Sequence, residues 1–299
     1  MSQPIITFAV PFYQNLEFLE RSLRSVMAQT MGAWVCTVHD DSGENEKVRE
    51  LIANLGDSRI GYVGNSPSNG MVANWNQCLD HCKTPLVTIL HADDELTTDY
   101  ARVMISLAEQ FPLVTGFFCD AEIIDEHSNP TVSFVDIVKY FLKPKTGEYL
   151  VIGGDEGLAR LAGGDFIMCP TVCYRMSTLS PLRFDDAWKF TVDWNFFVDI
   201  LLSGRSLVGI REKCYRYRRH GDQATALLSK NAVRFEEEFK TVKQIRRKAE
   251  TMGWPLTVRA SRRHIATQIH LIAYLVVALI KLDLTYAGLL YKTLKANYQ

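Results

Sequence analysis

Two pairs of adjacent carboxylates stand out among the residues whose types and spacing could do chemistry. Asp93 and Asp94 follow the apolar run 86–90. Asp40 and Asp41 follow an earlier apolar run. Carboxylate oxygens are hard ligands that suit Mg²⁺ or Mn²⁺ and leave room for water and phosphate oxygens. The later pair therefore indicates a divalent metal site facing a diphosphate, and the earlier pair could accept hydrogen bonds from a nucleobase and a ribose.

Each acidic pair also has a purely structural interpretation. A cap for a helix beginning near Leu96 would account for Asp93 and Asp94. A turn of Asp, Ser and Gly over 40–43 would account for the earlier pair. The two pairs taken singly leave both interpretations open.

Asp193 is the candidate general base. It lies among aromatic residues at the start of an amphipathic helix expected over 190–202. A partly buried carboxylate can take a proton from a hydroxyl when burial raises its pKa towards the working pH. The alternative is an acid favoured by the dipole at a helix N-terminus.

The segment 215–220 alternates aromatic and basic residues. Its Arg218 and Arg219 could hold phosphates, and His220 could offer an imidazole to a metal. The alternative is an edge strand with a solvated basic face.

The elements that must position these residues alternate along the chain. Apolar, β-branched runs predict strands over 5–10, 34–38, 60–63 and 86–90, and helical spacing predicts helices over 16–29, 46–55 and 71–82. Such alternation implies right-handed crossovers and a mainly parallel, doubly wound α/β sheet. Ligands bind beyond the carboxyl ends of the strands in these sheets, which is where both acidic pairs fall. Because the pairs would repel each other, a cation is expected beside them.

Composition and charge exclude several classes of protein. The 299 residues include 33 Lys and Arg against 34 Asp and Glu, so a polycation that binds nucleic acid is excluded. Seven Cys at irregular spacings indicate reduced thiols in a cytosolic protein. We expect no signal peptide from the N-terminal residues, and no run of about 20 uncharged apolar residues predicts a spanning helix.

The C-terminal region differs in composition from the rest. Between residues 240 and 263, Lys and Arg face a single acid, Glu250, and the apolar stretch 265–282 follows. Its ten successive apolar residues, 271–280, are about half of what a bilayer requires. We expect residues 240–299 either to dock on an anionic membrane surface or to form a helical hairpin that covers the catalytic domain or a dimer contact.

Seven short motifs in a fixed order resemble those of the inverting GT-A glycosyltransferases of family 2. They lie at residues 10–13, 39–43, 69–76, 90–94, 169–172, 192–194 and 218–220. The resemblance covers about residues 3–225. It implies a GT-A catalytic domain over 1–228, with a nucleotide-sugar half (about 1–110) and an acceptor half (about 111–228). A basic and then apolar helical region, 229–299, follows it.

The resemblance also implies roles for individual residues. The nucleotide sugar would be bound by Pro11, Phe12, Tyr13, Asp40, Asp41, Asn76, Asp93 and Arg218. Asp93 and Asp94, on the D-x-D-type element, would hold Mn²⁺ or Mg²⁺ together with His220, and Asp193 would be the base. Four positions depart from the family: Gln14, Trp75, His91 and Val192 stand where Asn, Arg, Asp and Glu are common. Which of the two carboxylates binds the metal therefore stays open.

The activity implied is transfer of a sugar from a nucleoside diphosphate sugar to a hydroxyl group, with inversion at the anomeric carbon. The donor nucleotide is expected to be UDP, with GDP and dTDP as alternatives. The acceptor is expected to be a saccharide or a lipid-linked oligosaccharide of surface polysaccharide synthesis. The protein is expected in the cytoplasm or on the inner face of the plasma membrane.

Two other functions are alternatives to this one. A GT-A domain that binds a sugar nucleotide without turning it over is the first alternative. A dinucleotide-dependent oxidoreductase is disfavoured, because no G-x-G-x-x-G follows the first predicted strand.

Overall fold

A computed structural model describes residues 3–131, 147–221, 228, 232–263 and 265–297. The chain divides into two compact units, which are described separately. The first consists of Met1–Val151, Ile167–Phe184 and Arg205–Arg219, and the second of Ile152–Phe166, Asp185–Gly204 and His220–Gln299. The predicted functional division between residues 228 and 229 stays a prediction.

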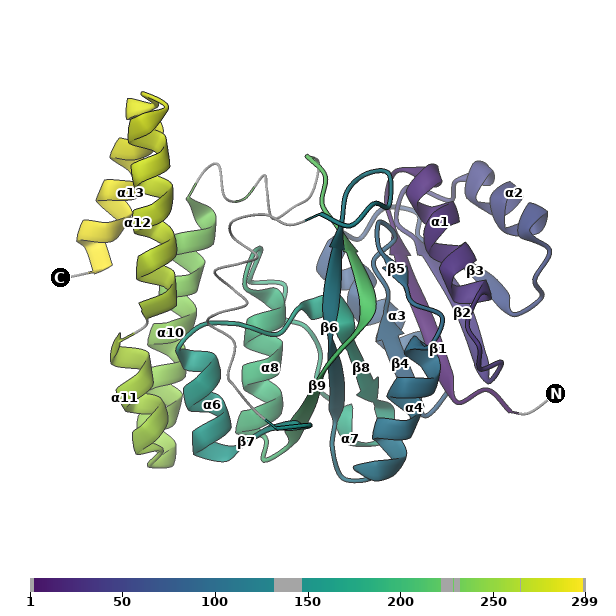
Figure 1. Cartoon of the computed structure of the whole chain (residues 1–299), viewed down its shortest axis with the longest axis horizontal. Helices are drawn as coiled ribbons and strands as arrows, with labels where there is room; N and C mark the ends of the chain where they lie inside the picture. Colours follow the sequence, from purple (N-terminus) through teal and green to yellow (C-terminus); the bar gives the residue numbers. More distant parts are fainter. Residues whose placement is uncertain (1–2, 132–146, 222–227, 229–231, 264, 298–299) are drawn as a thin grey trace. The chain divides into compact units, whose positions relative to one another are not determined.

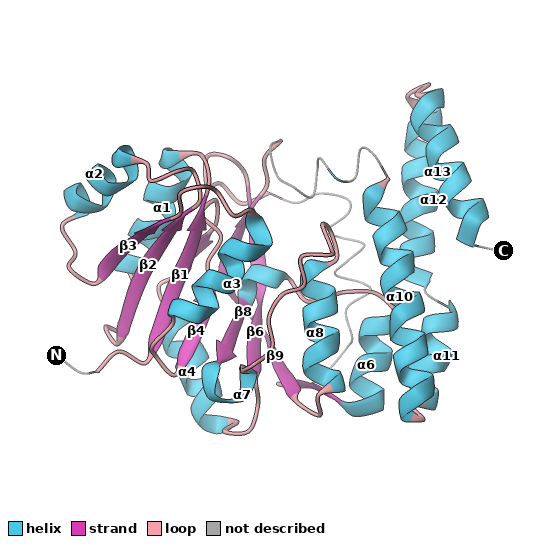
Figure 2. Cartoon of the chain, turned by 180° about the vertical axis from the view of Figure 1, so that it is seen from behind, coloured by secondary structure: helices cyan, strands magenta, loops and turns pink. Residues whose placement is uncertain are grey.

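The first unit is built on a mixed β-sheet (Figure 2). Its strands run in the order β3-β2-β1-β4-β8-β6-β9-β5. The parallel part comprises β1 (Ile6–Phe12), β2 (Trp34–Asp40), β3 (Ile60–Gly64) and β4 (Leu86–Ile89). The remainder comprises β5 (Glu95–Leu96), β6 (Gly116–Ile124), β8 (Val172–Arg175) and β9 (Ser206–Arg218). Strand β8 is antiparallel to β4 and β6, β9 is parallel to β6, and β5 is antiparallel to β9.

Helices flank this sheet in the order in which they connect its strands (Figure 1). They are α1 (Leu16–Met27), α2 (Glu46–Leu55), α3 (Met71–His81), α4 (Tyr100–Gln110) and the short α7 (Met176–Leu179). The side chains of Asn15 and Asn45 cap α1 and α2 by accepting hydrogen bonds from backbone N–H groups of the first turn. The expected α/β fold, mainly parallel in its first half, is confirmed.

The core explains why these segments form strands and helices. Strand β1 is rich in apolar residues because it is buried on both faces, with Phe8 and Val10 fully buried on one face and Ala9 on the other. Helix α1 adds Leu19, Leu23 and Val26, which recur at helical spacing on its buried face. Each such side chain contributes about 1.5–3 kcal/mol when it is fully buried.

Two expectations about the elements were wrong. No helix begins near Leu96: Glu95 and Leu96 form β5 by pairing with β9, and α4 starts at Tyr100. The segment 215–218 is not an edge strand, because β9 lies between β6 and β5. Local sequence could not reveal either pairing, since both join residues more than 90 positions apart.

The regular elements of the second unit, in the part that the structure describes, are helices and the end of β7 (Leu150–Gly153). Its helices are α6 (Gly154–Ala162), α8 (Val192–Leu202), α10 (Val233–Met252), α11 (Pro255–Arg263), α12 (Ile265–Ile280) and α13 (Leu284–Asn297). Phe235 and Phe239 of α10 form a small core with Leu271 of α12 and Leu290 of α13. The carboxylate of Asp155 in α6 accepts hydrogen bonds from the backbone N–H groups of Leu256 and Thr257, in the first turn of α11.

One helical stretch among the described residues, Pro255–Ile280, is long and apolar enough to cross a membrane by length and composition. No such segment was predicted from the sequence. That prediction depends on about 20 uncharged residues in a row, whereas this stretch is apolar on average and includes charged residues.

Candidate functional site

The carboxyl ends of β1, β2 and β4 lie beside one another. The register pairs Phe12 with Asp40 across β1 and β2, and Ala9 with Ile89 across β1 and β4. The residues that follow these strands therefore leave the sheet at one edge. The structure brings both acidic motifs to this edge, which is where open parallel sheets bind ligands.

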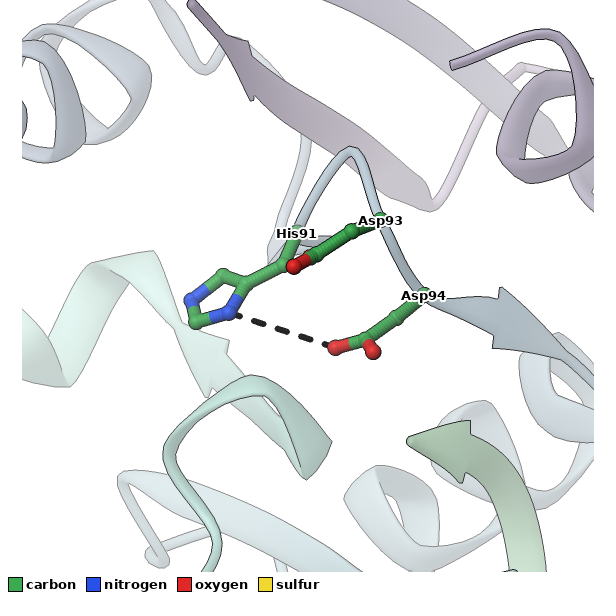
Figure 3. A group of neighbouring side chains, drawn as sticks. All are labelled: His91, Asp93 and Asp94. Atoms are coloured by element: carbon green, nitrogen blue, oxygen red, sulfur yellow. Dashed lines mark ion pairs between the residues drawn. The ribbon is translucent and has the colours of Figure 1, made fainter. Parts of the chain in front are cut away.

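His91, Asp93 and Asp94 form a cluster in the loop after β4 (Figure 3). One ligand atom from each residue lies within 4.8 Å of the other two. His91 Nδ1 is 3.9 Å from Asp94 Oδ2. Two carboxylates and one imidazole are a donor set that a divalent cation such as Mn²⁺ accepts. His91 was predicted only as a departure from the family and not as a candidate ligand, although the spacing His-x-Asp-Asp is visible in the sequence.

The imidazole of His91 is held between aromatic rings and the acids. It stacks on Trp75, with ring centroids 5.2 Å apart, and Trp75 meets Phe184 edge-on. Burial lowers the pKa of His91, so the ring stays neutral, which is the form that binds metal. Its Nε2 is buried and has no hydrogen-bond partner among the described residues. The cluster therefore fits a cation by donor chemistry and by spacing, with Nδ1 as the ring nitrogen that faces Asp94 (Figure 3).

Asp94 is fully buried and is anchored to β9. Its Oδ1 accepts a hydrogen bond from the backbone N–H of Arg218 (2.7 Å), and its Oδ2 accepts one from the hydroxyl of Tyr215 (2.9 Å). Burial, with Asp93 close by, raises the pKa of Asp94 well above its usual range. The cap interpretation of this pair is wrong, because the carboxylate of Asp94 bonds to a strand rather than to a helix.

Arg218 lies beneath the same loop, with its side chain 0% exposed. The guanidinium donates to the backbone carbonyl of Asp93 (2.7 Å), to that of Asp125 (2.8 Å), and to the side chains of Glu95 and Ser128. The solvated basic face considered for this segment is therefore wrong at Arg218. These contacts favour a positioning role for Arg218 over the predicted contact with the nucleotide sugar.

Asp40 and Asp41 are both buried, and each accepts several hydrogen bonds. Asp40 accepts from the side chains or N–H groups of Ser42, Asn45 and Tyr62. Asp41 accepts from Asn65, Ser68, Asn69 and Gly70. Burial alone raises the pKa of both carboxyls, but these bonds outweigh it and leave the pKa of each below its usual value.

Asp40 therefore stabilises the turn over residues 40–43, which was the structural alternative to a ligand-binding role. Asp41 shapes the loop that leads into α3, where Gly70 adopts a positive φ of 84° that favours glycine. Their contact with a base and a ribose stays a prediction.

The other residues predicted to bind the nucleotide sugar differ in exposure. Tyr13 is 65% exposed just beyond β1, whereas Phe12 is 2% exposed and belongs to the core. Pro11 is the last but one residue of β1 and is half-buried. Asn76 exchanges two hydrogen bonds with the backbone of Phe184, so both ends of its amide are occupied. Tyr13 is thus the member of this set best placed to meet a ligand.

Asp193 and His220 lie in the second unit. Asp193 is partly buried in the first turn of α8, and its Oδ1 accepts a hydrogen bond from the N–H of Trp194 (2.9 Å). His220 is the second residue after β9 and is not a member of the His91 cluster. Their roles as base and as metal ligand stay predictions.

Comparisons with known proteins agree with this architecture. WcaA of Escherichia coli (strain K12), named as a colanic acid biosynthesis glycosyl transferase, is 28% identical over 118 residues, which are 39% of this chain and 42% of WcaA. The chain thus matches less than half the length of this relative. The Escherichia coli protein WfgD is 23% identical over 73% of this chain and 78% of its own length. WfgD is named as a UDP-Glc:alpha-D-GlcNAc-diphosphoundecaprenol beta-1,3-glucosyltransferase.

A solved structure and a family model complete the comparison. The mannosyltransferase PcManGT from Pyrobaculum calidifontis, in complex with GDP-Man and Mn²⁺, superposes with a TM-score of 0.60 at 14% identity, covering 98% of this chain and 86% of that one. This likeness confirms the GT-A fold. The model of Glycosyl transferase family 2 matches residues 7–171, more than half of the chain, so the resemblance and the enzyme class are confirmed at the level of the family. The chain belongs to glycosyl transferase family 2.

Proposed function

We propose that the protein transfers a sugar from a nucleoside diphosphate sugar to a hydroxyl acceptor, with inversion at the anomeric carbon. The observation that carries this proposal is the cluster of His91, Asp93 and Asp94 at the strand edge that also holds Asp40 and Asp41. The packing of a sheet does not require a set of metal-binding side chains at its ligand-binding edge. A leaving diphosphate does, because a bound cation stabilises its negative charge.

The donor side of the reaction rests on the first unit. The exposed ring of Tyr13 would pack against the base, and the loop shaped by Asp41 would face the ribose. Asp93, with His91 or Asp94, would hold Mn²⁺ or Mg²⁺. A cation bound there supplies positive charge that stabilises the diphosphate as it leaves. His220 would add a ligand or a donor to the same diphosphate.

The relatives support the choice of donor and metal. The name of WfgD includes UDP-Glc, and PcManGT was solved with GDP-Man and Mn²⁺. We therefore propose UDP as the nucleotide, with GDP as the alternative to test beside it. The name of WfgD also includes a diphosphoundecaprenol-linked saccharide, which supports a lipid-linked acceptor.

The acceptor side rests on Asp193. Its carboxylate would take the proton from the acceptor hydroxyl as that oxygen attacks the anomeric carbon, opposite the leaving diphosphate. A single displacement of this kind inverts the configuration. A partly buried acid in the first turn of α8 has the exposure such a role requires.

We also propose that the C-terminal helices dock on an anionic membrane surface, on the inner face of the plasma membrane. Helix α12 buries one face, including Leu271 and Ala278. Its opposite face exposes an apolar stripe at helical spacing: Ile269, Ile272, Val276, Leu279 and Ile280. Arg259, Arg262 and Arg263 are exposed on the adjoining α11, as cationic residues beside a membrane-bound helix would be.

A transfer assay tests the proposed activity. Purified protein would be incubated with UDP-, GDP- and dTDP-sugars, with Mn²⁺ or Mg²⁺, and with saccharide and lipid-linked acceptors. We expect a product of inverted anomeric configuration, seen by NMR. Stabilisation by a sugar nucleotide without any turnover would instead indicate a binding module.

A further inference from the structure

Glu237, on helix α10, holds the chain that enters α8. Its carboxylate accepts hydrogen bonds from three successive backbone N–H groups: Lys189 (3.0 Å), Phe190 (2.7 Å) and Thr191 (3.1 Å). Glu237 is only 8% exposed. Hydrogen bonds to an ionised acceptor are roughly twice as strong as those between neutral groups. The segment two residues before Asp193 is therefore tied firmly to α10.

Thr241, one turn further along α10, fixes the other side of Asp193. Its hydroxyl donates to Thr191 Oγ1 (2.9 Å) and accepts from Asn195 Nδ2 (2.9 Å). Asn195 Nδ2 also donates to the carbonyl of Thr191 (2.8 Å). Thr191, Asn195 and Thr241 are all buried, so these bonds are shielded from water. The turn that carries Asp193 is thus held from residue 191 and from residue 195.

The hydrogen bonds of Glu237 end at Thr191, the N-cap position of α8, and so fix the chain just before the helix begins. The Thr191 hydroxyl accepts no capping hydrogen bond from a backbone N–H of the first turn, but it accepts one from Asn195 Nδ2 (3.1 Å). Next to Glu237 on α10, Arg234 pairs with Glu238 (2.8 Å) and lies 5.0 Å from the centre of the Phe190 ring. One face of α10, residues 234–241, is therefore built against the entry to α8.

We infer that Glu237 and Thr241 are positioning residues for Asp193, and that α10 completes the acceptor side of the reaction. The inference rests on the proposed role of Asp193 as the base. It assigns a reaction role to a helix that lies beyond residue 228, within the region that sequence reasoning set apart from the catalytic domain. A small displacement of a reacting group can reduce a rate by about 100-fold.

The test compares three variants of the full chain with the wild type. Glu237→Gln removes the charge at nearly constant shape, and Thr241→Val removes the hydroxyl. Glu236→Gln is the matched control, because Glu236 is the exposed neighbour on the same helix. For each protein, kcat and KM for the acceptor are measured per active site, with active sites counted by titration with UDP and Mn²⁺.

We expect kcat to fall by roughly 10- to 100-fold in Glu237→Gln, and less in Thr241→Val, while the dissociation constant of UDP stays the same. Glu236→Gln should behave as the wild type. A merely structural role would lower the number of active sites but leave kcat per site unchanged, and that result would overturn the inference. If Glu237→Gln fails to fold, an unchanged kcat per site in Thr241→Val would overturn it equally.

Asp193→Asn separates this inference from the proposal beneath it. Full activity in Asp193→Asn would show that Asp193 is not the base, and the positioning role of Glu237 and Thr241 would then be rejected with it. An inactive Asp193→Asn beside a fully active Glu237→Gln and Thr241→Val would reject only the positioning role.

Discussion

The hydroxyl of Tyr215 donates a 2.9 Å hydrogen bond to Asp94 Oδ2, although the two residues lie 121 positions apart. Strand β9 is separated from β4 by two strands, yet it reaches the acidic loop, residues 90–94, and fixes the orientation of a buried carboxylate. The backbone N–H of Arg218 binds the other oxygen of the same carboxylate. The acidic loop is therefore held in place by the last strand of the sheet along the chain.

Replacing Tyr215 by Phe should weaken both the fold and the metal site. The buried carboxylate of Asp94 would lose a donor, which costs about 1–3 kcal/mol of unfolding free energy. Loss of a group that orients a metal ligand typically reduces metal affinity by about 10- to 100-fold. Urea denaturation and titration with Mn²⁺ measure the two effects. Tyr291→Phe, on an exposed tyrosine, is the control, and equal Mn²⁺ affinity in both variants would contradict the role of Tyr215.

His91 should prove to be a metal ligand. We expect His91→Leu to weaken Mn²⁺ binding by at least about 10-fold, because the cluster loses one donor and keeps two carboxylates. His91→Asp should retain Mn²⁺ binding, since an oxygen ligand then replaces the imidazole. Calorimetric titration of the wild type and the two variants with Mn²⁺ measures these affinities. Unchanged affinity in His91→Leu would show that the two aspartates bind the metal without His91.

Stability should fall as the pH is lowered, in part through His39. Burial, with His81 nearby, lowers the pKa of His39 to about 4, whereas an unfolded histidine titrates near pH 6.5. Between these values the unfolded chain binds a proton that the folded chain does not, so the unfolding free energy decreases as the pH falls through this window. For one such group, the decrease in unfolding free energy reaches about 3 kcal/mol at pH 4.

Urea denaturation at a series of pH values measures this dependence. His39→Leu should flatten the slope between pH 6.5 and pH 4. His127→Gln, on an exposed histidine, should leave the slope unchanged. A slope in His39→Leu equal to that of the wild type would mean that other groups carry the effect.

The exposed stripe of α12 should bind membranes that carry negative charge. Sedimentation with phosphatidylglycerol vesicles should carry down the wild type but much less of a variant with Ile272→Asp and Val276→Asp. Replacing Arg259, Arg262 and Arg263 by Gln should also weaken binding, since each near-surface arginine contributes about 1 kcal/mol. Added salt should weaken it further.

The matched control carries Arg211→Gln and Lys213→Gln, at exposed basic positions of the first unit. Its binding should equal that of the wild type. Sedimentation that is the same for all of these proteins would reject the membrane proposal. A stripe that instead faces a second copy of the chain would make the molecular mass depend on concentration.

Local patterns were sufficient to predict much of the first unit. The apolar run of β1 and the helical spacing of α1 depend on neighbours a few residues apart, and both were placed within about two residues. β5 could not be predicted, because Glu95 and Leu96 become a strand only by pairing with Arg216 and Tyr215.

The residues that position the site could not be predicted either, because their partners are also distant in sequence. Arg218 resembles a solvent-facing cation in the sequence. In the structure its buried guanidinium donates hydrogen bonds to Glu95 and to the carbonyl groups of Asp93 and Asp125. Glu237 looks like one acid of a charged helix, and its three backbone partners lie more than 40 positions earlier. Motif order identified the family, but contacts that are distant in sequence determine which polar residues face a ligand.

The most direct test of the central claim is the turnover of Asp193→Asn, measured beside its affinity for UDP in the presence of Mn²⁺. We predict unchanged affinity for the nucleotide and a turnover lower by about 10²–10⁴-fold, because only the transfer of the acceptor proton is lost. Sugar transfer by Asp193→Asn at a rate close to that of the wild type would contradict the account.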